Sequence, residues 1–125
     1  TQPHMTAVAA QVIQAYGYDQ VNLNMGCPSN RVSGRQCGAI LMKQSSRAVD
    51  LVTTVKENVS TNMPVSVKCR IGVDDCDDFD FLADWIQQLQ EAGCRRFILH
   101  ARKCLLRGLS PSQNRSVPPL NYPIV

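Results

Sequence analysis

The pattern of apolar and polar positions divides the chain into alternating helical and extended segments. Apolar residues recur at helical spacing in three segments, 4–16, 48–59 and 79–89. Short runs that contain Val, Leu or Ile occupy three others, 19–24, 65–70 and 96–100. The first set predicts amphipathic helices and the second predicts strands. Strands that are apolar along their length and alternate with helices are typical of a parallel α/β fold.

The segment ends carry capping and turn signals. Ser45–Ser46 is expected to cap the second helix, and Asp77 or Asp78 the third. Residues 28–38, rich in Ser, Asn, Arg and Gly, predict a loop. The proline-rich tail 108–125 has no periodic pattern and predicts an extended loop rather than a helix or central strand.

Three residues with useful chemistry stand at or just after the ends of the predicted strands: Cys27, Lys68 and His100. Ligands of parallel α/β folds bind at the carboxyl ends of the strands. The sequence therefore predicts a site at this edge of the sheet. Because three strands leave two edges unpaired and a barrel needs about eight strands, we interpret the chain as a segment of a larger fold.

Composition narrows the class of protein. The chain has 125 residues, 44% of them hydrophobic, which corresponds to one globular domain at most. It has neither a bilayer-length apolar run nor a signal-peptide pattern, so we expect no membrane partner. The expected location is intracellular: cytoplasmic, or an organelle if a targeting segment has been lost. Six cysteines without a Cys-x-x-Cys pair predict reduced thiols and no metal site.

Charge is distributed unevenly along a chain whose net charge is +3. Six aspartates lie between Asp74 and Asp84, whereas the segment from Arg95 to Arg115 holds six basic residues and no carboxylate. This asymmetry suits a surface that faces a polyanion, and equally a solvated face without a partner.

Three motifs occur in a fixed order: LNMGCPSNRVSGRQCGAILM, PVSVKCRIGVDD and FILHARKCLLRGLSPSQNRSVPPLNY. Together they resemble the tRNA-dihydrouridine synthases, and the HARK…GLSP..NR..PPL stretch is most similar to the A-type subfamily. The resemblance extends along essentially the whole chain.

The resemblance implies an FMN-linked oxidoreductase on a (β/α)8 TIM barrel that a helical domain follows. Residues 1–125 would be a partial catalytic domain of about three β/α units, without the first and last strands or the helical domain. In this family NADPH reduces FMN, the flavin passes hydride to C6 of a D-loop uridine, and a cysteine protonates C5. The implied partner is tRNA, with no metal, and the full-length parent is expected to be a monomer.

Site residues follow from the matching positions of the motifs. Cys27 matches the proton donor, and Lys68 and His100 match flavin contacts. The positions that match substrate contacts are Asn24 and Arg70 near the uridine and Arg115 toward the tRNA. The basic loop with Lys103 and Arg107 is expected to contact phosphates.

Structural roles remain open beside these functional ones. Cys27 could be a small buried residue, Lys68 a cation at the rim, and His100 a hydrogen-bonded structural residue. Asn24 could cap its own turn, and Arg70 could pair with the aspartates at 74–78. Trp85 is expected in the core.

Two other functions also remain open. The first is a truncated, inactive fragment with at most weak RNA binding. The second is a flavin barrel reductase that acts on free pyrimidines, which the basic GLSP..NR loop disfavours because a small substrate needs no such surface.

Overall fold

The computed structural model describes residues 2–125, with the exception of the Asn30 side chain. The elements, in chain order, are α1 (Pro3–Ala15), β1 (Val21–Asn24), α2 (Asn30–Ser33), the 3-10 helix η1 (Gly38–Lys43), α3 (Ser45–Asn58), β2 (Val65–Arg70), α4 (Phe79–Glu91), β3 (Arg96–His100), and the 3-10 turns η2 (Gln113–Arg115) and η3 (Tyr122–Ile124). The three predicted strands and the three predicted amphipathic helices are all confirmed.

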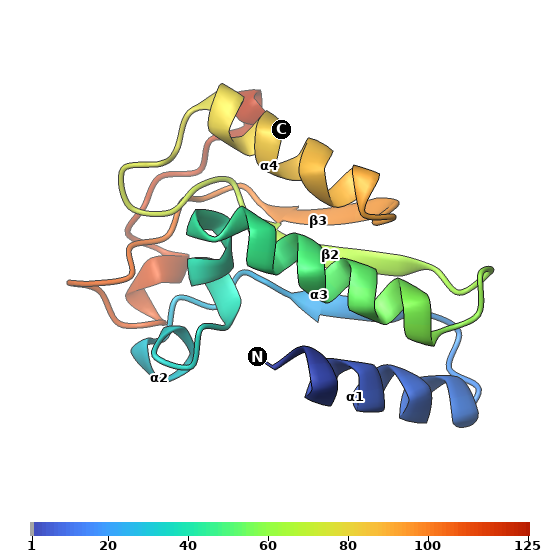
Figure 1. Ribbon diagram of the computed structural model, residues 1–125. Helices are drawn as coiled ribbons and strands as arrows, with labels where there is room; N and C mark the ends of the chain where they lie inside the picture. The colour runs from blue at the N-terminus through green and yellow to red at the C-terminus, as the bar shows by residue number, and fades with distance from the viewer. Residues whose placement is uncertain (1) are drawn as a thin grey trace.

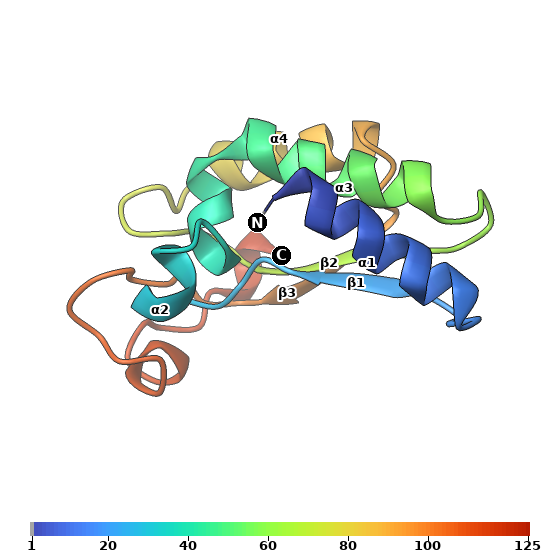
Figure 2. The same ribbon diagram turned by 60° about the horizontal axis from the view of Figure 1, so that its bottom comes forward.

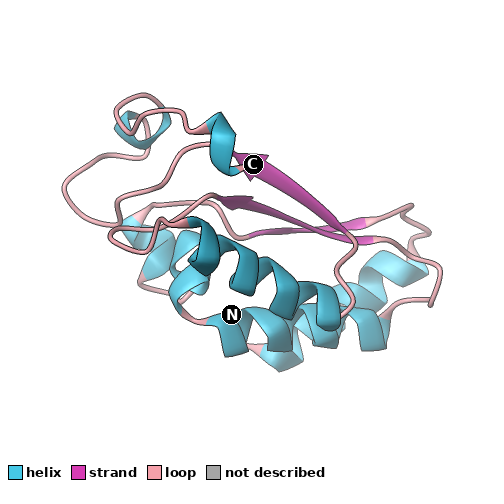
Figure 3. Ribbon diagram, turned by 90° about the horizontal axis from the view of Figure 1, so that it is seen from above, coloured by secondary structure: helices cyan, strands magenta, loops and turns pink. Residues whose placement is uncertain are grey.

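The strands form a parallel sheet in the order β1-β2-β3, so β2 pairs with a neighbour on each side. Helices α1, α3 and α4 all lie on one face of this sheet (Figure 3). The carboxyl ends of the strands point to the left in Figure 1, where α2 and the loop after β3 also lie. The predicted parallel α/β architecture is therefore present, and the strand ends share one edge.

The main core lies between the sheet and α3 and α4. Val67 and Cys69 of β2 are fully buried, as are Val52 of α3 and Leu89 of α4. Trp85 is 1% exposed, and its indole N–H donates to the Leu41 carbonyl at 3.3 Å. That bond satisfies the one polar atom of a large buried side chain, so the core placement predicted for Trp85 is confirmed.

The two cap predictions have opposite outcomes. The Asp78 carboxylate accepts a hydrogen bond from the Phe81 N–H at 2.7 Å, which confirms it as the N-cap of α4. The Ser45–Ser46 cap is wrong, because α3 already begins at Ser45. Gln44 stands at its N-cap position without a side-chain cap bond.

The loop predictions are confirmed only in part. Residues 28–38 contain the four-residue helix α2, so this segment is not wholly irregular. The tail is irregular as predicted, apart from the short turns η2 and η3. In the described residues, no helix is both long and apolar enough to cross a bilayer.

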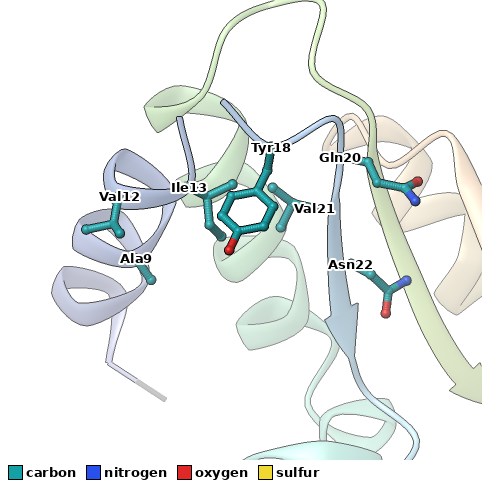
Figure 4. A pocket seen from close by; sticks show the side chains of 7 residues that line it. All are labelled: Ala9, Val12, Ile13, Tyr18, Gln20, Val21 and Asn22. Atoms are coloured by element: carbon teal, nitrogen blue, oxygen red, sulfur yellow. The ribbon is translucent and has the colours of Figure 1, made fainter. Parts of the chain in front are cut away.

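The apolar stripe of α1 is largely exposed, which the helical pattern alone did not indicate. Met5 and Tyr16 are 59% and 79% exposed, and Ala10 is the buried residue of this helix. A hollow of about 510 Å³ lies between α1 and β1, with Ile13, Tyr18 and Val21 in its lining (Figure 4). The described residues therefore leave the outer side of α1 and the β1 edge uncovered.

Candidate active site

The sheet face opposite the helices carries the polar side chains of the three strands. Along a strand, successive side chains alternate between the two faces. Those that alternate with the helix-facing residues are Asn22, Asn24, Ser66, Lys68, Arg70, Arg96, Ile98 and His100. The register sets Asn24 beside Lys68 and Arg70 beside His100. Four predicted site residues, from three strands, thus share one face near the carboxyl edge.

Cys27 occupies the turn that follows β1, and a second segment fixes its backbone. Its carbonyl accepts a hydrogen bond from the Ala39 N–H at 2.9 Å. Gly38 has φ +73° and lies so close to Cys27 that an added Cβ would be 2.5 Å from the Cys27 carbonyl oxygen. Only glycine permits both this backbone conformation and this approach. The side chain of Cys27 is partly buried, which fits a thiol held at the edge of a site rather than in the core.

Asn24 caps its own turn, one of the alternatives that the sequence left open. Its Oδ1 accepts from the Gly26 N–H at 3.1 Å, and the Met25 N–H donates to the Lys68 carbonyl at 2.8 Å. These bonds fix the path from β1 to Cys27. The Asn24 amide group remains as a donor on the exposed side chain.

Lys68 and His100 differ in their exposure and charge. Lys68 is exposed in the middle of β2, and no ion pair involves it in the part of the chain described. His100 is partly buried at the end of β3. Its pKa is lowered, first by burial and then by the positive charges of Arg70, Lys68 and Arg102. The face therefore pairs an available cation with a histidine that favours its neutral form.

Arg70 is 4% exposed, and its guanidinium donates to two main-chain carbonyls. One bond runs to Asn114 at 2.9 Å and a longer one to Lys103 at 3.4 Å. Burial is the first cause that lowers its pKa, and the charges of Arg102 and Arg115 act in the same direction. The suggested pairing of Arg70 with the aspartates at 74–78 is therefore wrong.

Those aspartates pair with lysines instead. Asp74 lies 2.7 Å from Lys43, and Asp77 lies 2.7 Å from Lys103. Both pairs are partly exposed, so we ascribe little stability to them. The pair with Asp77 partly neutralises Lys103, whereas Arg107 and Arg115 of the same basic loop are exposed. No local pattern indicates these pairs, because their members are far apart along the chain.

Asn114 is a polar residue of the site region that the sequence analysis missed. It is fully buried, and its side chain bonds to the loop that follows β3. It belongs to the quoted GLSP..NR stretch, where only Arg115 received a role. The signal was present in the motif, but its burial depends on how the tail folds back.

Cysteine environments separate one candidate from the core thiols. Burial raises the pKa of Cys69 to about 12 and that of Cys104 to about 11, and it raises the pKa of Cys94 as well. Cys37 is partly buried like Cys27, and its thiol contacts the Arg35 carbonyl at 3.3 Å. No group of three or more potential ligands is arranged for a metal among the described residues.

Comparison with known proteins gives this geometry a context. The sequence model of the dihydrouridine synthase family (Dus) matches residues 1–125. The chain belongs to the dihydrouridine synthase family. Within that family, three curated relatives named tRNA-dihydrouridine(20/20a) synthase are each 48% identical to it. They come from Pasteurella multocida, Xanthomonas campestris and Escherichia coli K12.

The alignments cover 96%, 96% and 98% of this chain. They cover only 36%, 35% and 35% of the relatives. The chain therefore spans about a third of the length of the curated proteins that it matches. The resemblance drawn from the motifs is confirmed at the level of the family.

Replacement of Gly38 by alanine tests the close contact behind Cys27. Gly17 also has a positive φ, +69°, but nothing lies within 4 Å of the position of an added Cβ. We expect Gly17→Ala to cost about 1–2 kcal/mol of unfolding free energy through backbone strain. Gly38→Ala should cost clearly more, because the Cys27 carbonyl must move. Urea denaturation of the full-length protein measures both, and equal losses would contradict the steric role of Gly38.

Titration of His100 tests the electrostatics of the open face. Because its folded pKa lies below the ordinary 6.5, protonation favours the unfolded chain. The contribution of neutral His100 to stability is thus complete above pH 6.5 and is lost as pH falls through the folded pKa. We expect the stability difference between wild type and His100→Gln to change in that window. An NMR titration midpoint of His100 at or above 6.5 would refute this prediction.

Proposed function

We propose that this chain is part of the catalytic domain of a tRNA-dihydrouridine synthase, which reduces the C5–C6 double bond of a D-loop uridine. The observation that carries the proposal is the shared edge of the sheet. There, in a member of this family, Cys27 follows β1, Lys68 lies within β2 two residues before its end, and His100 ends β3, and these three strands are adjacent and parallel. The names of the relatives indicate tRNA as the substrate class.

The three strands fit a segment of a (β/α)8 barrel. All long helices cover one face of the sheet (Figure 2), and the other face carries polar residues, as the interior of a barrel near its active site does. Strands β1 and β3 each have one unpaired edge within the described residues. We propose that further strands of the full-length protein pair there and that the open face is the barrel interior.

The residues of the open face fit a flavin. Lys68 is a cation without a carboxylate partner among the described residues, and His100 favours its neutral form. An exposed ammonium can bind the electron-rich edge of an isoalloxazine ring, and a neutral imidazole can donate one hydrogen bond to it. When bound, FMN would supply the hydride that C6 receives, with NADPH as the source of electrons.

Cys27 is the proposed acid. Its neutral thiol would donate the proton to C5 and become a thiolate. Asn24 and Arg70 lie on the same face and can hold the uridine, whose base must leave its stack to reach them. Arg115 is exposed and can contact a phosphate of the tRNA.

Two competing functions give different results in one assay. A reductase of free pyrimidines would reduce uracil but leave tRNA unchanged. An inactive fragment would reduce neither uracil nor tRNA, although the full-length parent protein would still modify tRNA. The exposed arginines Arg107 and Arg115 favour the tRNA substrate, since a free base has no phosphates to bind.

Substitution of Cys27 tests the proposed acid. We expect Cys27→Ala in the full-length protein to lower dihydrouridine formation in tRNA by about 100-fold or more, because general acids contribute at least about this factor. The loss follows because no other proton donor stands at this position. Mass spectrometry of the tRNA nucleosides measures the product. Cys37→Ala, which removes a second partly buried thiol, is the matched control and should retain activity.

Substitution of Lys68 tests the flavin site independently of turnover. We expect Lys68→Ala to weaken FMN binding by about tenfold, the cost of one hydrogen bond to a charged group. Fluorescence titration of the apoprotein with FMN measures the affinity. Lys56→Ala, on α3 and away from the open face, is the control. Equal affinities of Lys68→Ala and wild type would remove Lys68 from the flavin site.

A further inference from the structure

We propose that Asn114 is a positioning residue, which holds Arg70 and the loop 105–113 together as one unit for binding RNA at the site. This inference rests on the proposed function and deepens it. It gives a role to a residue that contacts neither of the proposed reacting groups. The side chain of Asn114 hydrogen-bonds the loop, and its main-chain carbonyl hydrogen-bonds Arg70.

The Asn114 side chain closes the loop after β3. Its Oδ1 accepts from the Leu105 N–H at 2.8 Å, and its Nδ2 donates to the Leu105 carbonyl at 3.0 Å. Longer bonds from Nδ2 reach the carbonyls of Leu109 at 3.4 Å and Ser110 at 3.3 Å. A single fully buried amide thus joins both ends of the loop. Loss of this amide would leave several polar groups of the backbone without a partner.

The Asn114 main chain holds the guanidinium of Arg70. Its carbonyl accepts the shorter of the two bonds from Arg70 Nη1, at 2.9 Å. No carboxylate forms an ion pair with Arg70 in the described part of the chain. The carbonyl dipole is therefore a principal partner of a buried cation that stands beside His100 on the open face.

These two sets of bonds couple the loop surface to the strand face. Arg107 lies in the loop and Arg115 directly follows Asn114, and both are exposed. An RNA backbone bound by these arginines is thus held in register with Arg70 and with the neighbouring residues of the sheet. Without the Asn114 side chain, residue 114 would no longer be fixed to the loop. The loop and Arg70 would then move independently, and the bound uridine would be positioned less accurately.

A double-mutant cycle with Arg70 tests the coupling. We expect Asn114→Ala to lower kcat/KM for tRNA by about 10- to 100-fold, the loss that a displaced positioning group produces. We expect Arg70→Ala to have a similar effect. The double variant should lose little more than the larger single loss, because Asn114 acts through Arg70. Dihydrouridine formation by the full-length protein is the assay, at a temperature where all variants are folded.

The matched control is Asn121→Ala, which removes the same side chain from an exposed position in the same tail. It should leave kcat/KM unchanged. Multiplication of the two single losses in the double variant would overturn the proposal, because a merely structural Asn114 would act independently of Arg70. Equal activity of Asn114→Ala and wild type would overturn it as well.

A smaller change keeps the test decisive if Asn114→Ala does not fold. Asn114→Ser retains a hydroxyl that can accept from the Leu105 N–H, and the same cycle is then run with this variant. The proposed function and this inference fail in distinguishable ways. A wild-type protein that forms no dihydrouridine in tRNA overturns the proposed function, whereas an active wild type with an additive cycle overturns only the role of Asn114.

Discussion

The packing of β2 is the constraint on which the rest of this structure depends. As the middle strand, it buries Val65, Val67 and Cys69 against the helices, and this fixes which face its alternate residues occupy. Lys68 and Arg70 must then lie on the opposite face. A shift of one residue in register would bury Lys68 in the core, at a large cost for an unpaired charge. The core therefore determines the orientation of the site.

Positive charge accumulates on the open face because its strands contribute no carboxylate. The nearby aspartates Asp74 and Asp77 pair with Lys43 and Lys103 instead. Arg70 consequently donates to main-chain carbonyls rather than to a carboxylate. This arrangement gives a surface suited to anionic or electron-rich ligands without the cost of dissociating a buried ion pair.

The segments around the site differ in how firmly the described contacts fix them. The Cys27 turn is held by Gly38 and Ala39, and the loop after β3 is closed by Asn114. By contrast, α1 exposes most of its apolar stripe. Among the described residues, the turn after β1 is therefore held by more contacts than the outer side of α1.

The sequence by itself determined the element order, the parallel sheet and the set of polar residues at the strand ends. Apolar periodicity and motif order are local properties, so they could be identified without coordinates. Only the tertiary structure decided that Arg70 binds the Asn114 carbonyl rather than an aspartate, that Asp77 neutralises Lys103, and that the α1 stripe stays exposed. These outcomes depend on contacts between residues that are distant along the chain, and a local pattern does not encode which of several possible partners is brought close.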